Sequence, residues 1–282
     1  MKRIPGLLAG ALAALALHAQ STAEFRAMNT PVEPFRIVGE LYYVGAANVT
    51  SLLIATPDGH ILIDGGFPET APLIHANLRK LGFRMRDVKA LLSTHAHQDH
   101  AGGLAELKKL TRAKLYAGER DIGQLSRGGT GDFAFGDTMP FPPVTADVAV
   151  KEGDEVTVGN VTVRAVETPG HTKGCISWVF SIPDPQTGRT YKVVFIGGST
   201  APGYQLVNNE QYPEIVSDFE ATFRKLRALE CDILIEGHGF TFGLKEKMAG
   251  ERSFVDPEGY RERIDVCERD VRNIVAAQSG AK

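Results

Sequence analysis

Residues 93–103 read STHAHQDHAGG and directly follow the short apolar run 88–92. The stretch places three imidazoles and one carboxylate within six residues, namely His95, His97, Asp99 and His100. Histidines crowded in this way repel one another when charged and lose hydration when buried, unless a cation collects them. The alternative is a polar surface loop, but so many good ligands at one strand-to-loop junction indicate a metal site.

The composition of the 282-residue chain is that of an ordinary globular protein, with 43% hydrophobic and 23% charged residues. The formal net charge is −3, and no block rich in lysine or arginine occurs. A nucleic-acid partner therefore has no electrostatic support, and a polyanion held in a basic groove is disfavoured as substrate. We expect a small-molecule substrate and a monomeric protein.

The first residues have the order of a secretory signal. Lys2 and Arg3 precede the apolar segment LLAGALAALAL at residues 7–17, and Ala19 or Ala23 offers a cleavage point. The segment is too short to span a bilayer as a helix, and a buried N-terminal helix is the alternative. We expect a signal peptide over residues 1–23 and a single domain over residues 24–282. The mature protein would be periplasmic or secreted, without membrane attachment.

Strand and helix patterns alternate along the chain, with no tandem repeat or dividing linker. Apolar runs and turn residues predict strands at 35–44, 49–55, 60–64, 88–92, 114–117, 148–150, 155–158, 161–166, 177–182, 191–196 and 231–235. Helical spacing predicts helices at 69–81, 103–110, 212–229 and 257–277.

The segment 126–143 is rich in glycine and proline but also carries aromatic side chains, including Phe133, Phe135 and Phe141. Glycine and proline argue against regular structure, and the aromatic residues are too apolar for a solvated linker. Two interpretations are equally supported. The segment is either a wall or lid of a binding site, or a loop that its aromatic side chains pin to the surface.

The chain has three cysteines, so at least one stays unpaired in an oxidising compartment. We favour a Cys231–Cys267 disulfide, which would join the last helix to the last strand for about 3–4 kcal/mol. Cys175 would then be a free, buried thiol, with a role as metal ligand as the alternative.

Two further histidines, His171 and His238, also follow apolar strands. Each taken alone is more often structural than a ligand. Open α/β folds, however, place their ligands at the carboxyl ends of strands, where all five of these histidines are expected. His95, His97 and His171 could hold one ion, and Asp99, His100 and His238 a second. Three protein ligands leave an open position at each metal, which is the catalytic arrangement.

The ordered set of these six residues resembles the metallo-β-lactamase superfamily, and most closely the third subclass of class B β-lactamases. That subclass uses three histidines at one zinc and Asp-His-His at the other, without a cysteine ligand. The segments 127–137, 168–172 and 201–206 are also similar to its members. The resemblance implies an α/β (α+β) fold, a four-layer αββα sandwich with the site at one edge of its two sheets. The Cys231–Cys267 pair matches a disulfide of the subclass.

The resemblance also implies two Zn²⁺ ions per chain and an activity. The protein would hydrolyse the β-lactam amide of penicillins, cephalosporins and carbapenems through a zinc-bound hydroxide, and so confer antibiotic resistance. Asp99 and His97 would then be catalytic together with the hydroxide. Ser199 and Thr200 are candidates to bind the substrate carboxylate, and Phe135 of the aromatic loop to contact the substrate.

The residues after the predicted strand 191–196 distinguish among activities of this fold. Thioesterases and lactonases of the superfamily carry a metal-bridging aspartate there, whereas this chain has Gly197-Gly198-Ser199-Thr200. The missing carboxylate favours a β-lactamase over a lactonase or thioesterase. Open coordination argues against a non-catalytic zinc-binding protein. One departure is Gly198, where many members have serine. Asp64 could orient a ligand imidazole or cap a turn.

Overall fold

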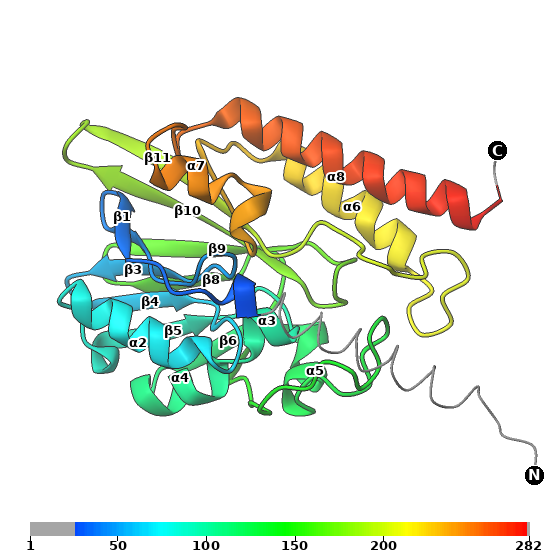
Figure 1. The fold of residues 1–282 in the computed structure, drawn as a ribbon, viewed down its shortest axis with the longest axis horizontal. Helices are drawn as coiled ribbons and strands as arrows, with labels where there is room; N and C mark the ends of the chain where they lie inside the picture. The colour runs from blue at the N-terminus through cyan, green and yellow to red at the C-terminus, as the bar shows by residue number, and fades with distance from the viewer. Residues whose placement is uncertain (1–25, 281–282) are drawn as a thin grey trace, which may run out of the picture.

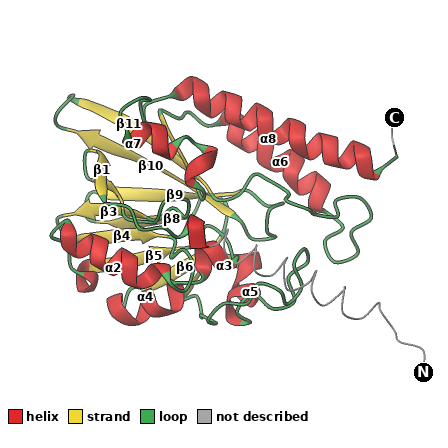
Figure 2. Cartoon of the chain, in the orientation of Figure 1, coloured by secondary structure: helices red, strands yellow, loops and turns green. Residues whose placement is uncertain are grey.

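The computed structural model describes residues 26–280, so the predicted signal segment lies outside the described residues. Two β-sheets lie face to face, and helices cover the outer face of each sheet (Figures 1 and 2). This arrangement confirms the expected four-layer αββα sandwich. Within residues 26–280, none of the helices is both long and apolar enough to cross a membrane.

The first sheet has seven strands in the order of the sequence. Its first four strands pair antiparallel and its last four pair parallel. The strands are β1 (Phe35–Val38), β2 (Leu41–Tyr43), β3 (Leu52–Thr56), β4 (Gly59–Ile63), β5 (Val88–Leu92), β6 (Lys114–Gly118) and β7 (Val148–Val150). The single strand expected over 35–44 is instead the hairpin β1–β2, because the chain turns at Gly39, which has a φ of +47°.

The second sheet has five strands in the order β12-β11-β10-β9-β8, and only β11 and β12 pair parallel. The strands are β8 (Glu155–Val158), β9 (Val161–Glu167), β10 (Ile176–Asp184), β11 (Arg189–Ile196) and β12 (Ile233–Glu236). The three strands predicted in succession over 148–166 therefore divide between the sheets. β7 ends the first sheet, and β8 begins the second.

The longer helices form where they were expected. The helices are α2 (Thr70–Lys80), α3 (Gln98–Ala101), α4 (Leu104–Thr111), α5 (Ile122–Ser126), α6 (Ile215–Ala228), α7 (Leu244–Met248) and α8 (Pro257–Gln278), with 3-10 turns at Met85–Asp87, Glu119–Asp121 and Gly239–Thr241. Helices α2 and α4 pack on the first sheet, and α6 and α8 on the second (Figure 1). The sequence patterns did not predict α3, α5 and α7, which span only four or five residues each.

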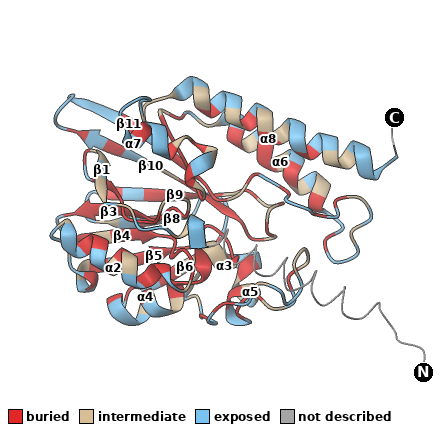
Figure 3. Ribbon diagram, in the orientation of Figure 1, coloured by how far each residue is buried: buried red, intermediate tan, exposed pale blue. Residues whose placement is uncertain are grey.

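The core has two layers of apolar side chains, because successive residues of a strand point to opposite faces of its sheet. Leu52 and Ile54 of β3 face Trp178 of the second sheet, whereas Leu53 between them packs under α2. Figure 3 shows the buried residues concentrated in the sheets and the exposed ones on the outer helix faces. Trp178 also donates its indole N–H to the backbone oxygen of Ser93, 3.2 Å away. The second sheet thus anchors the loop that carries the first histidines.

The predicted Cys231–Cys267 disulfide is wrong, since both cysteines are free and buried. Cys267 lies against Ser199, near the carboxyl end of β12, with 3.3 Å between Sγ and Oγ. Cys231 lies just before β12 and lines a surface cavity together with Tyr260 of α8. Tyr260 and Cys267 are seven residues apart, or about 10 Å along a helix, whereas a disulfide needs Cα atoms within about 7 Å. Cys175 is the free, buried thiol that was expected.

Candidate metal centre

The predicted ligands meet at one edge of the sandwich, where strands of both sheets end. His95 and His97 follow β5 of the first sheet. His97 is the N-cap residue of α3, the short helix that carries Asp99 and His100. His171 and His238 follow β9 and β12 of the second sheet. The expectation that all five histidines lie at carboxyl ends of strands is confirmed. The helical turn at α3 explains how Asp99 and His100 come to point away from His97.

The first group of ligands consists of His95, His97 and His171, each offering one ligand atom. These atoms all lie within 4.8 Å of one another. Nδ1 of His97 is 3.2 Å from Nε2 of His171, and the His95 ring centroid is 4.9 Å and 4.7 Å from the other two. The spacing suits a single ion bound by three imidazoles.

The second group surrounds the carboxylate of Asp99. Oδ2 of Asp99 lies 3.5 Å from Nε2 of His100 and 3.3 Å from Nε2 of His238. His95 is also close, because its ligand atom lies within 4.8 Å of those of Asp99 and His100. The structure thus brings all six predicted ligands together, and His95 lies between the two groups.

In each second-group histidine, the ring nitrogen that faces away from Asp99 lies near an oxygen atom, which forms a hydrogen bond in His238 and only a close approach in His100. Nδ1 of His238 is 3.0 Å from the backbone oxygen of Asn48, and Nδ1 of His100 is 3.4 Å from Oδ2 of Asp64. Asp64 also accepts hydrogen bonds from the backbone N–H and hydroxyl of Thr94, at 2.7 Å and 2.6 Å. It therefore lies beside a ligand imidazole, as the first alternative for Asp64 proposed, and holds the start of the ligand loop through Thr94. The contacts to Thr94 and His100 do not cap a local turn. Such partners fix which ring nitrogen presents its lone pair to a metal.

The first group is held from outside in a similar way. Nδ1 of His171 donates to the backbone oxygen of Thr200 at 2.7 Å, and Nδ1 of His95 is 3.1 Å from the Thr94 hydroxyl. The opposite nitrogen of His95, Nε2, is buried and has no hydrogen-bond partner among the described residues. A buried polar atom without a partner is costly, and a cation would satisfy it. The donor set of imidazoles and one carboxylate fits a divalent metal.

The electrostatics of the site follow from burial and from its crowded histidines. Burial and the neighbouring imidazoles hold the pKa of His95 well below its usual value, and burial with the nearby His97 lowers that of His171 to about 3. Burial also disfavours charge on His100, but Asp99 and Asp64 outweigh it and raise the pKa of His100 to about 10. His95 and His171 are therefore neutral at pH 7, as metal ligands must be.

One residue that the sequence reasoning missed, Asp121, ties the two ligand loops together. Its buried carboxylate accepts hydrogen bonds from the backbone N–H groups of Ala96 and Gly174, at 3.0 Å and 2.7 Å. A third comes from the Thr172 hydroxyl at 2.7 Å. Ala96 stands between His95 and His97, and Thr172 follows His171. No local pattern around Asp121 could have indicated this, because its partners come from distant loops.

The aromatic loop at residues 126–143 borders the site and is also held in place by its aromatic side chains. The interpretation as a wall and the interpretation as a pinned loop therefore both hold in part. The ring of Phe135 contacts that of His97, with centroids 5.3 Å apart, and also packs against Tyr204. Tyr204 in turn stacks on His171. Asp132 of the same loop approaches His97, with 3.5 Å between Oδ2 and Nε2. The sequence patterns did not indicate a role for Asp132, although this residue directly precedes Phe133 of the aromatic loop.

Ser199 and Thr200 follow β11 and line a small cavity of about 40 Å³ with His95, His100, His171 and His238. Thr200 is exposed, whereas Ser199 is buried. The Ser199 hydroxyl lies 3.3 Å both from Oε1 of Glu236 and from Sγ of Cys267. The predicted contact of Ser199 and Thr200 with a substrate stays a prediction.

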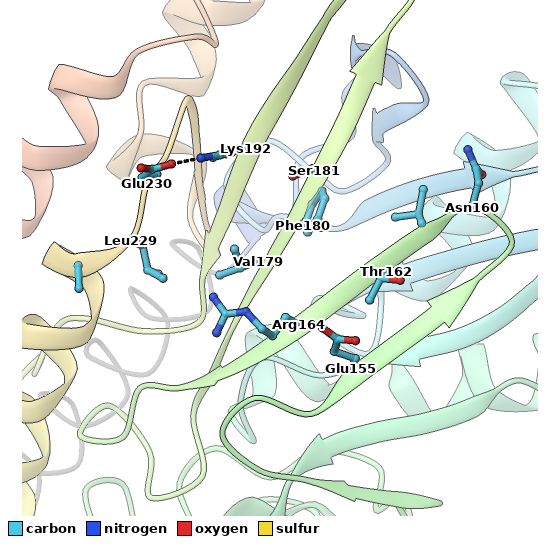
Figure 4. Close-up of a pocket in the computed structure, with 12 residues that line it drawn as sticks. Glu155, Asn160, Thr162, Arg164, Val179, Phe180, Ser181, Lys192, Leu229 and Glu230 are labelled. Atoms are coloured by element: carbon cyan, nitrogen blue, oxygen red, sulfur yellow. Dashed lines mark ion pairs between the residues drawn. The ribbon is translucent and has the colours of Figure 1, made fainter.

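Larger cavities lie elsewhere on the molecule, but they lack metal-binding chemistry. One of about 590 Å³ lies on the outer face of the second sheet, where Lys192 and Glu230 form an ion pair (Figure 4). Another of about 660 Å³ adjoins it under α8. Among the described residues, both potential metal-binding groups lie at the histidine-rich edge. Catalytic chemistry is therefore expected at the small cavity rather than at the larger ones.

The family model of the metallo-β-lactamase superfamily matches residues 44–184, which include His95, His97, Asp99, His100 and His171. The chain belongs to this superfamily. Membership supports a metal-dependent hydrolase, in agreement with the potential ligand groups of the site.

Solved metallo-β-lactamases are similar to this superfamily member over most of its length. One from Cronobacter sakazakii, described by a HARLDQ motif, is 39% identical with a TM-score of 0.86, covering 92% of this chain and 99% of that one. Residues 95–100 of this chain read HAHQDH. FEZ-1 of Legionella gormanii is 37% identical, with a TM-score of 0.85 and coverages of 89% and 98%. BJP-1 of Bradyrhizobium japonicum, a subclass B3 enzyme, is 37% identical, with a TM-score of 0.83 and coverages of 90% and 97%.

Curated relatives carry a different name. A hydroxyacylglutathione hydrolase of Rhodopseudomonas palustris is 40% identical over 113 residues, which are 40% of this chain and 36% of that protein. Another from Nitrobacter hamburgensis is 33% identical over 176 residues, 62% of this chain and 56% of that protein. The chain thus spans about a third to about half of the length of these curated relatives.

Proposed function

We propose that the protein is a zinc-dependent β-lactamase that binds two Zn²⁺ ions and hydrolyses the amide bond of penicillins, cephalosporins and carbapenems. The observation that carries the proposal is the absence of an acidic residue after β11, where the chain has Gly197-Gly198-Ser199-Thr200. Asp99 is then the one carboxylate in the two ligand groups of the described residues. Similarity to solved β-lactamases over about nine-tenths of the chain supports the same substrate class.

The residues divide between the two ions as follows. His95, His97 and His171 would hold one zinc, and Asp99, His100 and His238 the other. Bound zinc would polarise the substrate carbonyl and lower the pKa of a coordinated water.

The surrounding residues position these ligands and the substrate. Asp99 stays ionised between His100 and His238, because these neighbours lower its carboxyl pKa despite burial. Thr200 is exposed beside His171, so its hydroxyl is better placed than that of the buried Ser199 to bind a substrate carboxylate. Phe135 packs edge-on against the ring of His97, with centroids 5.3 Å apart, and would contact the substrate ring system.

The second candidate function is thioester hydrolysis, which the names of the curated relatives favour. Hydrolysis of a lactone by the same fold belongs to this second candidate. The physical argument against it is the missing second carboxylate, because a metal-bridging aspartate would change the charge of the site by one unit. A panel of substrates separates the candidates directly.

The test measures hydrolysis of nitrocefin, a carbapenem, a hydroxyacylglutathione thioester and a lactone, each with and without a chelator. We expect β-lactam turnover that the chelator abolishes. Replacement of His97 or His171 by alanine should lower kcat/KM by at least about a hundredfold. His75→Ala on helix α2 is the control, since His75 lies outside the ligand groups. Turnover of the thioester alone would overturn the proposal.

Export completes the proposed function, because resistance requires the enzyme to meet the antibiotic outside the cytoplasm. We propose that residues 1–23 are removed and that the mature protein is periplasmic or secreted. The support is the charged-then-apolar order of the first residues. N-terminal sequencing of protein from the periplasmic fraction should begin near residue 20 or 24, and an intact Met1 in that fraction would contradict the proposal.

A further inference from the structure

We propose that Asp132 is a positioning residue that holds His97 in the tautomer required for metal binding and couples metal occupancy to the order of the aromatic loop. The inference rests on the proposed binding of zinc at the first group of histidines. The two oxygens of the Asp132 carboxylate have different neighbours. One lies near the predicted ligand His97, and the other accepts hydrogen bonds from the loop backbone.

His97 is oriented differently from the other first-group histidines. His171 turns Nδ1 outward to the backbone oxygen of Thr200, so that its Nε2 faces inward. In His97 it is Nδ1 that faces inward, 3.2 Å from Nε2 of His171, and Nε2 that points away. For Nδ1 to present a lone pair to a metal, the proton of His97 must reside on Nε2. A hydrogen-bond acceptor beside Nε2 would favour this tautomer.

Asp132 supplies such an acceptor. Its Oδ2 lies 3.5 Å from Nε2 of His97, and both side chains are buried, with exposures of 7% and 8%. Nε2 of His97 is buried and makes no hydrogen bond among the described residues, so this carboxylate is the acceptor that lies beside it. The contact is long, and metal binding at Nδ1 would strengthen it, because coordination makes the opposite N–H a better donor. A carboxylate in this position also offsets the positive charge of the ion.

The other oxygen of Asp132 organises the loop. Oδ1 accepts hydrogen bonds from the backbone N–H groups of Ala134 and Phe135, both at 2.8 Å. The backbone groups of Asp132 and Gly136 also bond to each other in both directions, at 3.1 Å and 2.9 Å. Residues 132–136 therefore form a closed turn around this carboxylate. The turn places Phe135 against His97.

Through these two sets of contacts, Asp132 connects the position of His97 to the conformation of the turn at residues 132–136. A shift of His97 on metal loss would leave Oδ2 with the side-chain amide of Gln124, 3.4 Å away, as its remaining partner among the described residues. The same carboxylate folds the turn that carries Phe135. The substrate-facing wall of the site should therefore be most ordered when the first metal is bound. A purely structural role for Asp132 predicts no such dependence, because the backbone contacts of Oδ1 do not involve the metal.

The decisive variant is Asp132→Asn in the full-length chain. Asparagine keeps a carbonyl oxygen for the N–H groups of Ala134 and Phe135, but it turns an N–H₂ donor toward the N–H of His97. Asp132→Ser is the second variant. Serine can also accept hydrogen bonds from the backbone of a turn, but its shorter side chain cannot reach Nε2 of His97. Asp137→Asn is the matched control, because Asp137 lies in the same loop and its carboxylate accepts a hydrogen bond from the Gly131 N–H, at 2.8 Å, without contacting a predicted ligand among the described residues.

The first measurement is zinc affinity, determined by competition with a chromophoric chelator. We expect Asp132→Asn and Asp132→Ser to weaken zinc binding at the site of His95, His97 and His171 by about 10- to 100-fold. Asp137→Asn should stay within about twofold of the unsubstituted protein. Wild-type affinity in both Asp132 variants, with folding verified by circular dichroism, would overturn the proposal.

The second measurement is amide hydrogen exchange of residues 132–136 with and without zinc, which needs no catalytic activity. Zinc should slow this exchange in the unsubstituted protein and in Asp137→Asn, but not in Asp132→Asn. An equal zinc effect in all three proteins would contradict the coupling. If the protein binds zinc and shows these differences but hydrolyses no β-lactam, the proposed function fails while the role of Asp132 stands.

Discussion

At the scale of single residues, the imidazole rings of His171 and His100 each pack against the backbone of a glycine. A Cβ atom added to Gly198 would stand 2.6 Å from the ring of His171, and one added to Gly237 would stand 2.3 Å from that of His100. Real side chains do not approach so closely, so any larger residue would displace the imidazole. Glycine at position 198 is thus required by the packing of His171 in this chain.

The substitution Gly198→Ala tests this packing. The added methyl group should push His171 out of line, weaken zinc binding by about tenfold or more, and lower β-lactam turnover with it. Chelator competition and nitrocefin kinetics measure the two effects. Gly123→Ala is the control, because its Cβ would meet only the flexible end of Arg127, at 3.1 Å. Unchanged zinc affinity in Gly198→Ala would show that His171 can move aside freely.

At the scale of elements, helix α8 packs on the second sheet in a position that separates Cys267 from Cys231. Cys267 faces Ser199 at the site end of β12, whereas Tyr260 lies near Cys231 at the other end. Both thiols are buried, and burial raises the pKa of Cys231 to about 12 and that of Cys267 to about 11. The helix is held by apolar contacts and by the ion pair of Arg263 with Glu236, at 2.7 Å, rather than by a covalent bond.

The state of these cysteines is open to direct titration. Without reductant, the denatured protein should expose three thiols per chain, and the native protein should react slowly at pH 8 because the thiols stay protonated. Since both pKa values are raised above their ordinary value of 9, the thiols stabilise the fold below pH 9. This stability is lost as the pH rises through 11 to 12. Denaturant unfolding between pH 8 and 11 measures the loss. A single reactive thiol in the denatured chain would instead show a disulfide.

At the scale of the whole molecule, the metal centre joins the two sheets. His95, His97, Asp99 and His100 follow the first sheet, and His171 and His238 the second. Without an ion, this edge holds buried imidazoles in contact, including the unpartnered Nε2 of His95. An ion that binds the folded chain should therefore stabilise the entire sandwich and not merely order the loops around it.

Metal removal tests this stabilisation. Zinc at a hundredfold excess over its Kd should add about 2.7 kcal/mol per site to the free energy of unfolding, and a chelator should remove it. For a chain of this size, each kcal/mol corresponds to about 2–4 °C in Tm, which differential scanning calorimetry resolves. Mg²⁺ at the same concentration is the control, because it prefers oxygen ligands. Equal Tm values with zinc and with chelator would contradict a metal centre that bridges the sheets.

The sequence by itself determined the alternation of strands and helices and the set of potential metal ligands, and its resemblance to a known superfamily implied the layered arrangement. Strand and helix periods are local, and the spacing of His95, His97, Asp99 and His100 brings four ligands into one short loop. Their grouping with His171 and His238 followed from the rule that ligands gather at the carboxyl ends of strands. These predictions needed no knowledge of how distant residues pack.

Only the tertiary structure decided the contacts between segments far apart in the chain. The division of β7 and β8 between the sheets, and the separation of Cys231 from Cys267, depend on how whole elements pack. Asp121 and Asp132 hold the ligand loops through partners that no sequence spacing reveals. The physical reason is that burial and hydrogen bonding across elements are set by three-dimensional packing, whereas sequence patterns report only the period and the neighbours of each residue.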